Sequence, residues 1–111
     1  MEQVEETLAA LLKKREMTVT AAESCTGGMI AARLVNVPGI SDYFWGSFVT
    51  YANEAKTTLL GVDEQLLERK GAVSLEVAEA MALGAAKAAG ADVAISSTGI
   101  AGPDGGTPEK P

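Results

Sequence analysis

The chain has 111 residues, enough for one domain that buries roughly two-thirds of its unfolded surface, and its net charge is −6. This acidic balance argues against a nucleic-acid-binding protein, because neutralising phosphate groups requires a basic surface. No apolar run approaches the roughly 20 residues of a membrane span, and the N-terminal residues are acidic where a signal peptide would be basic, so we expect a cytoplasmic protein.

The absence of histidine from the sequence restricts the chemistry that a catalytic site could use. Neither a Ser–His nor a Cys–His pair can form within the chain, so a general base has to be a lysine, aspartate, glutamate or tyrosine. Cys25 is the one cysteine, which excludes an internal disulfide. One cysteine without histidine also argues against a zinc site.

The first predicted element is a helix near the N-terminus. Its acidic residues come early and its basic residues come late, as the helix macrodipole prefers. The apolar residues that recur at helical spacing are Val4, Leu8, Leu11 and Leu12. This helix carries no residue pattern with an obvious chemical role.

A short strand and a second helix follow, separated by a polar turn. Residues 18–22 are β-branched or small, which is typical of a covered strand. The helix is predicted from Met29 to about Asn36, where Pro38 and Gly39 close it.

The remaining predicted elements are, in chain order, a strand at residues 45–51, helices at residues 54–60, 63–70 and 75–89, and a strand at residues 92–98. The expected helix caps are Asn53, Asp63 and Ser74. Strands separated by helices predict an α/β fold with a sheet covered by helices, in which ligands bind outside the carboxyl ends of the strands. We therefore expect Ser24, Tyr51 and Thr98, at three strand ends, to converge on one pocket. The Gly/Pro-rich residues 99–108 are the one segment expected to be mobile.

The first candidate site is the turn between the first strand and the second helix. This Ser24 turn has the sequence S-C-T-G-G at residues 24–28. Backbone N–H groups at a strand-to-helix junction lack intrahelical partners and favour an anion or a developing oxyanion. Ser24 is therefore a candidate nucleophile, and the residues that could offer N–H groups to an oxyanion are Cys25, Thr26, Gly27 and Gly28. The alternative is an ordinary helix start, because serine is a favoured N-cap. Cys25 is either a rival nucleophile or a small buried apolar residue.

Lys56 is the candidate general base. The other lysines lie in last helical turns or in the tail, whereas Lys56 lies in a first turn, where the macrodipole disfavours a positive charge by about 0.3 to 1 kcal/mol. Burial would have to supply the rest of the shift from a pKa of about 10.4 to near 7 or 8. The alternative is a solvated helix residue.

Four further residues lie near the expected mouth of the site. Tyr51 could donate a hydrogen bond there or be an amphipathic strand end. Glu23 could orient the lysine or bind a sugar hydroxyl, although a surface carboxylate is the default expectation. Thr98 and Gly99 are placed to contact substrate, but Thr98 could equally be a β-branched strand residue.

Four ordered motifs together resemble the C-terminal domain of the CinA family, the nicotinamide-nucleotide amidohydrolases. They are A-A-E-S-C-T-G-G at residues 21–28, G-S-F-V-T-Y-A-N-E-A-K at residues 46–56, G-A-V-S at residues 71–74 and S-T-G-I-A-G-P-D-G-G at residues 97–106. The resemblance implies a three-layer α/β/α sandwich around a mostly parallel or mixed sheet. It also implies hydrolysis of the carboxamide of nicotinamide mononucleotide to nicotinate mononucleotide and ammonia, without a metal or other cofactor.

By position, the resemblance implies Ser24 as the nucleophile, Lys56 as its base, and Tyr51 and Thr98 as polar groups of the site. We expect a single domain at residues 1–111 that lacks the final strand and helix region of the family. The expected partners are the nucleotide and a second copy of the chain, rather than nucleic acid or a membrane. The alternative function is a catalytically silent nucleotide-binding or assembly domain, because about a third of the family's domain is missing.

Overall fold

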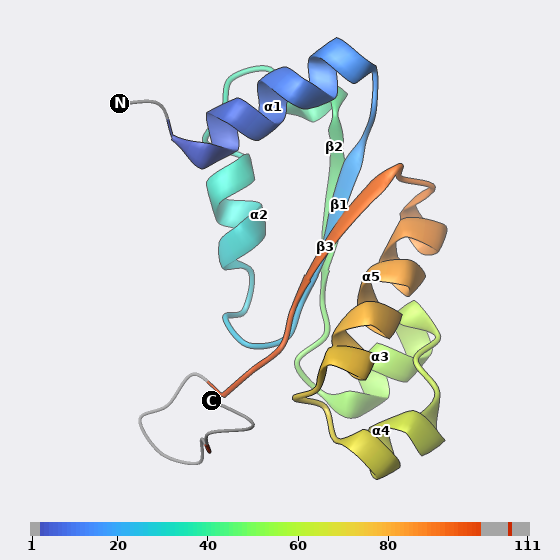
Figure 1. Ribbon diagram of the computed structural model, residues 1–111. Helices are drawn as coiled ribbons and strands as arrows, with labels where there is room; N and C mark the ends of the chain where they lie inside the picture. Colours follow the sequence, from blue (N-terminus) through green and yellow to red (C-terminus); the bar gives the residue numbers. More distant parts are fainter. Residues whose placement is uncertain (1–2, 101–106, 108–111) are drawn as a thin grey trace.

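The computed structural model of the chain describes residues 3–100 and Thr107 (Figure 1). Within these residues, no helix has both the length and the apolar character needed to cross a membrane. The Gly/Pro-rich segment at residues 99–108, which was expected to be mobile, lies largely outside the described residues.

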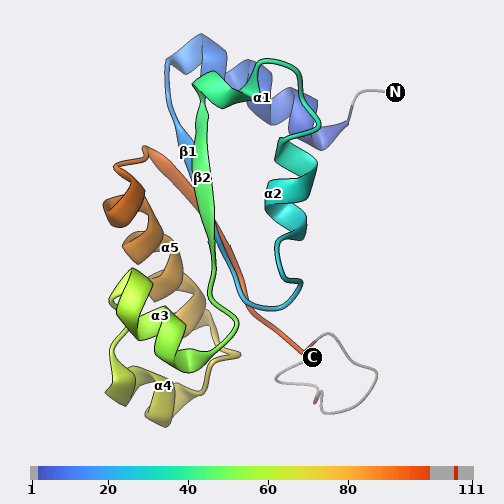
Figure 2. The same ribbon diagram turned by 180° about the vertical axis from the view of Figure 1, so that it is seen from behind.

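Three parallel strands form the central sheet: β1 (Val19–Glu23), β2 (Phe44–Val49) and β3 (Val93–Ser97), in the order β2-β1-β3. All five residues of β1, the middle strand, are buried, which explains its β-branched and small composition. Helices cover both faces of the sheet, as Figure 1 and the reverse view in Figure 2 show. The predicted α/β/α sandwich with a mostly parallel sheet is confirmed.

One face of the sheet is covered by α1 (Val4–Arg15) and α2 (Met29–Leu34). Leu12 of α1 and Leu34 of α2 are each 3% exposed and pack around Val19 of β1. Of the apolar residues that predicted the first helix, Leu12 alone is fully buried, whereas Val4 and Leu11 are exposed. The helix therefore turns a narrow apolar stripe toward the sheet.

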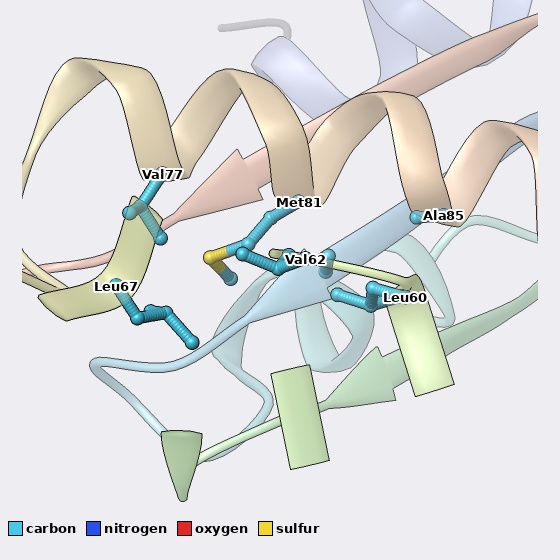
Figure 3. Close-up of a cluster of buried hydrophobic side chains, with 7 residues drawn as sticks. Leu60, Val62, Leu67, Val77, Met81 and Ala85 are labelled. Atoms are coloured by element: carbon cyan, nitrogen blue, oxygen red, sulfur yellow. The ribbon is translucent and has the colours of Figure 1, made fainter. Parts of the chain in front are cut away.

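The opposite face carries α3 (Asn53–Leu60), α4 (Glu64–Lys70) and α5 (Leu75–Ala89). Figure 3 shows Met81 and Ala85 of α5 pointing toward Leu60, the last residue of α3, and Val62, which follows that helix. Both Met81 and Ala85 are completely buried. Within the described part of the chain, the cluster on this face has seven buried residues and the cluster under α1 and α2 has three, so this face holds the larger of the two cores.

Local sequence signals place several helix ends correctly. The Asp63 carboxylate accepts a hydrogen bond from the Gln65 N–H at 2.8 Å, and the Ser74 hydroxyl accepts one from the Val77 N–H at 3.2 Å. These contacts confirm the predicted caps of α4 and α5. Gly61 and Gly90 end α3 and α5 in the left-handed conformation that glycine adopts without strain.

The predicted second helix is too long. It ends at Leu34 instead of about Asn36, because the N–H groups of Asn36 and Val37 bond to the carbonyls three residues earlier, a tightened last turn. A short 3₁₀ helix at Ile40–Asp42, which the sequence analysis did not predict, leads into β2.

Two predictions around β2 are also wrong. The strand ends at Val49 rather than Tyr51, and it starts one residue earlier than predicted, at Phe44, which pairs with Val19 of β1. The next residue of β1, Thr20, pairs with Gly46, so the register shifts by one residue and leaves a bulge in β2. Trp45 is the extra residue of this bulge. Asn53 is not a helix cap: the carbonyl of Ala52 already accepts the Lys56 N–H, so α3 begins one residue earlier than predicted, with no side-chain cap.

Candidate active site

The carboxyl ends of the three strands lie side by side and form the edge on which the candidate site is built. Glu23 at the end of β1 pairs with Val49 of β2 and with Ser97 of β3. The Ser24 N–H donates to the Ser97 carbonyl at 3.0 Å, and the Thr50 N–H donates to the Glu23 carbonyl at 2.8 Å. Ser24, Thr50 and Thr98 therefore follow three neighbouring strand ends, which is the juxtaposition that the sequence predicts for Ser24 and Thr98.

Lys56 is completely buried on the first turns of α3, directly beyond this edge. Its Nζ donates to the carbonyl of Thr50 at 2.7 Å and to the carbonyl of Tyr51 at 3.2 Å. Burial lowers the pKa of Lys56 below its ordinary value, because desolvation penalises the ammonium form. The alternative interpretation of Lys56 as a solvated helix residue is wrong.

Continuous backbone contacts connect Lys56 to Ser24. The Lys56 amine bonds to the Thr50 carbonyl, the Thr50 N–H bonds to the Glu23 carbonyl, and Glu23 directly precedes Ser24. The Thr50 hydroxyl is buried beside them and has no hydrogen-bond partner among the described residues. Thr50 is a residue of this edge that the sequence analysis missed, since its role depends on the pairing of β2 with β1.

The Ser24 turn leaves a run of backbone donors unused. Ser24 is 8% exposed, and its own N–H is taken by Ser97. Within the described part of the chain, no hydrogen bond has the backbone N–H of Cys25, Thr26, Gly27 or Gly28 as its donor. Gly27 and Gly28 have φ angles of 74° and 122°, a region that residues with side chains rarely adopt. The turn can therefore offer N–H groups to an anion, as the sequence analysis expected of it.

Glu23 is the residue whose position the sequence analysis predicted least well. It is completely buried rather than on the surface. Its carboxylate accepts from the N–H groups of Ile30 at 2.7 Å and Ala31 at 3.1 Å, at the start of α2. One sequence signal pointed to such a partner: Gly28, the N-cap of α2, has no side chain to satisfy these amides. The start of α2 is therefore occupied by a carboxylate of the chain itself.

The other predicted site residues are spread along the same edge. The Tyr51 side chain is 77% exposed, and it is the Tyr51 carbonyl that contacts Lys56. The Thr98 hydroxyl donates to the Ala72 carbonyl at 2.8 Å, which ties the end of β3 to the loop before α5. Cys25 and Gly99 are half-buried. Within the described residues, no cluster of His, Cys, Asp or Glu side chains could hold a metal ion.

A cavity of about 280 Å³ opens beside the end of β3. Its lining includes Ser97, Thr98 and Ser74, the cap of α5, but neither Ser24 nor Tyr51. The expected single pocket for all three strand ends is therefore not seen in this cavity, which lies on the β3 side of the edge.

The sequence pattern of the CinA C-terminal domain matches residues 1–111. The chain belongs to the CinA C-terminal domain family. A CinA-like protein of Citrifermentans bemidjiense is 60% identical over 110 residues, covering 99% of this chain and 27% of the relative. A putative competence-damage inducible protein of Symbiobacterium thermophilum is 59% identical over 110 residues, with 99% of this chain and 26% of the relative covered.

Solved structures of CinA relatives share the fold described above. The competence/damage inducible protein CihA from Agrobacterium tumefaciens superposes with a TM-score of 0.91 at 43% identity, covering 96% of this chain and 65% of its own. A CinA superfamily protein from Escherichia coli gives a TM-score of 0.91 at 41% identity, covering 96% of this chain and 62% of its own. This CinA domain thus spans about a quarter of the curated relatives and about two-thirds of the solved chains.

Proposed function

We propose that this CinA domain hydrolyses the carboxamide of nicotinamide mononucleotide to nicotinate mononucleotide and ammonia, as an amidohydrolase of pyridine nucleotide salvage. Membership of the CinA family supports the proposal. The observation that carries it is the burial of Lys56, in a chain without histidine, beside the strand end that leads into Ser24. A buried lysine with a lowered pKa can serve as the base that a serine nucleophile needs.

The contacts of Lys56 fit the neutral amine. A neutral amine has two N–H groups and one lone pair, and the carbonyls of Thr50 and Tyr51 accept two N–H groups. The lone pair is then free to take a proton. Both carbonyls can accept from the ammonium form as well, so it is burial, and not these contacts, that favours the neutral amine.

The proposed reaction has two stages. The Ser24 oxygen attacks the carboxamide carbon while the Lys56 amine takes the hydroxyl proton, and N–H groups of the Ser24 turn stabilise the oxyanion. The C–N bond then breaks as Lys56 returns the proton to the leaving ammonia. Water, deprotonated by Lys56, attacks the resulting ester, and Lys56 returns that proton to the Ser24 oxygen as the ester bond breaks and nicotinate mononucleotide is released.

Ammonia release from nicotinamide mononucleotide tests this function. We expect Ser24→Ala and Lys56→Ala each to lower kcat by about 100- to 10,000-fold, the usual contribution of such groups. Lys87→Ala is the matched control, because Lys87 is exposed in the last turn of α5. Turnover that survives either Ser24→Ala or Lys56→Ala at the wild-type rate would rule out the proposed mechanism.

A nucleotide-binding or assembly domain without turnover is the second candidate. It is favoured by the cavity beside the end of β3, which is lined by Ser97 and Thr98 but not by Ser24, so that a ligand bound there would not meet the proposed nucleophile. Titration calorimetry with nicotinamide mononucleotide separates the two candidates, since heat of binding without ammonia release supports the silent domain.

The proposal also covers location and partners. We place the reaction in the cytoplasm, with a nucleotide as substrate, neither nucleic acid nor a membrane as partner, and a second copy of the chain completing a homodimer. Exposed apolar side chains on the face around β2 support the dimer; Val35 is 61% exposed and Trp45 is 64% exposed. Light scattering of the purified protein gives the mass, and a monomer at all concentrations would contradict the dimer.

A further inference from the structure

Glu23 connects the two elements that flank the Ser24 turn, β1 before it and α2 after it. Glu23 is the residue directly before the turn, at the end of β1, and is 0% exposed. Its side chain reaches past the turn to the N–H groups of Ile30 and Ala31 in α2. One residue thus connects the last position of the strand to the first turn of the helix.

Thr26 adds a contact from the middle of the same turn. Its hydroxyl donates to the Glu23 carboxylate at 3.3 Å and accepts from the Met29 N–H at 3.4 Å. The Glu23 carboxylate therefore binds the centre of the turn, through Thr26, and the start of the helix that follows the turn, through Ile30 and Ala31.

The turn needs such support because its backbone is intrinsically loose. Gly27 and Gly28 follow Thr26, and glycine loses more conformational freedom on folding than any other residue. The N–H groups of residues 25–28 make no hydrogen bond to the rest of the described chain. The side-chain contacts of Glu23 and Thr26 are thus the hydrogen bonds that span these residues.

We propose that Glu23 is a positioning residue that fixes the Ser24 turn, so that the Ser24 hydroxyl and the N–H groups of residues 25–28 face the substrate together. This inference rests on the proposed function for its effect on turnover. Glu23 acts through the turn and touches no reacting atom. Misplacing catalytic groups by about 1 Å can cost about 100-fold in rate, so loss of the contacts of Glu23 is expected to act mainly on kcat.

Three variants of Glu23 and Thr26 and one control variant test the inference in this protein. Glu23→Gln keeps the size of the side chain but replaces one acceptor oxygen by an NH₂ donor that faces N–H groups of α2. Thr26→Val removes the hydroxyl, whereas Thr26→Ser keeps it. Leu67→Ala is the control for stability, because Leu67 is 8% exposed in the core under α4 and makes no hydrogen bond to the turn.

We expect Glu23→Gln to lower kcat for nicotinamide mononucleotide by about 100-fold and Thr26→Val by about 10-fold, with KM within a factor of about three. Thr26→Ser should restore the wild-type kcat, and Leu67→Ala should lower the unfolding midpoint without lowering kcat. The inference is overturned if Glu23→Gln keeps the wild-type kcat, or if kcat falls in proportion to stability in all variants, Leu67→Ala included.

Amide NMR shifts test the role of Glu23 without depending on catalytic activity. Glu23→Gln should move the N–H signals of Gly27 and Gly28 as well as those of Ile30 and Ala31, and Leu67→Ala should leave them in place. A wild-type protein that releases no ammonia would refute the proposed function alone, and the shifts would still decide the role of Glu23. Unmoved Gly27 and Gly28 signals in Glu23→Gln would overturn it.

Discussion

Lys56 makes the stability of the protein depend on pH in a predictable direction. Its pKa is lowered by burial, whereas in the unfolded chain it returns to about 10.4. Between these two values the unfolded chain binds a proton at Lys56 that the folded chain does not, so the free energy of unfolding rises with pH. This stability is lost as the pH falls toward the folded pKa, and below that value the contribution is constant.

Comparison with Lys56→Met isolates this effect, because methionine does not titrate. We expect the free energy of unfolding of the wild type, minus that of Lys56→Met, to rise with pH up to about 10.4, by no more than about 1.4 kcal/mol per pH unit. Urea titrations at a series of pH values measure the difference. A flat or falling difference for Lys56→Met would contradict the prediction.

Lys56 illustrates which features of the site a local sequence pattern can predict and which it cannot. Position alone distinguished Lys56 from the other lysines, because a first-turn lysine is locally unfavourable. The two carbonyls that bind it belong to residues five and six positions earlier, in the loop that β1 and β2 hold in place. Glu23 was misjudged for a related reason: its partners lie seven and eight residues later, and its burial depends on α2 packing over the sheet.

At the scale of elements, Gly84 lets α3 and α5 approach each other. A Cβ atom at this position would overlap the carbonyl oxygen of Leu60, at the end of α3. Gly84→Ala gains up to about 1 kcal/mol of helix propensity, but the overlap with rigid backbone costs about 1 to 3 kcal/mol or more. We therefore expect a lower urea midpoint for Gly84→Ala.

The control for Gly84 lies in the same helix. Ala88 is exposed on α5, so Ala88→Gly measures helix propensity without the contact to α3. It should lower stability by about 1 kcal/mol. If Gly84→Ala raises the midpoint by the amount that Ala88→Gly lowers it, then α3 and α5 do not require a glycine.

Element boundaries were predictable where one residue determines them. Asp63 and Ser74 start helices through their own side chains, and Gly61 and Gly90 stop them through their backbone freedom. The limits of β2 were not predictable in this way. Its bulge at Trp45 arises from the register against β1, which no local pattern encodes.

At the scale of the whole molecule, β1 joins the two cores. Val19 faces the core under α1 and α2, whereas Ala22 belongs to the core under α3, α4 and α5. Both are completely buried. Because β1 is covered by helices on both faces of the sheet, loss of the helices from either face would expose the middle strand. We therefore expect the described domain to unfold as one cooperative unit.

Two core variants and two probes test this cooperativity. Leu12→Ala removes a side chain under α1 and Met81→Ala removes one under α5; each should cost about 2 to 5 kcal/mol. Trp45, the single tryptophan, reports by fluorescence on β2, and far-UV circular dichroism reports on all helices. In both variants the two probes should give one shared urea midpoint and an unchanged slope. Leu83→Ala, at a position 65% exposed on α5, should stay within about 0.5 kcal/mol of the wild type. Separate midpoints for the two probes in Leu12→Ala would mean that the face under α1 and α2 opens on its own, and that β1 does not couple the two cores.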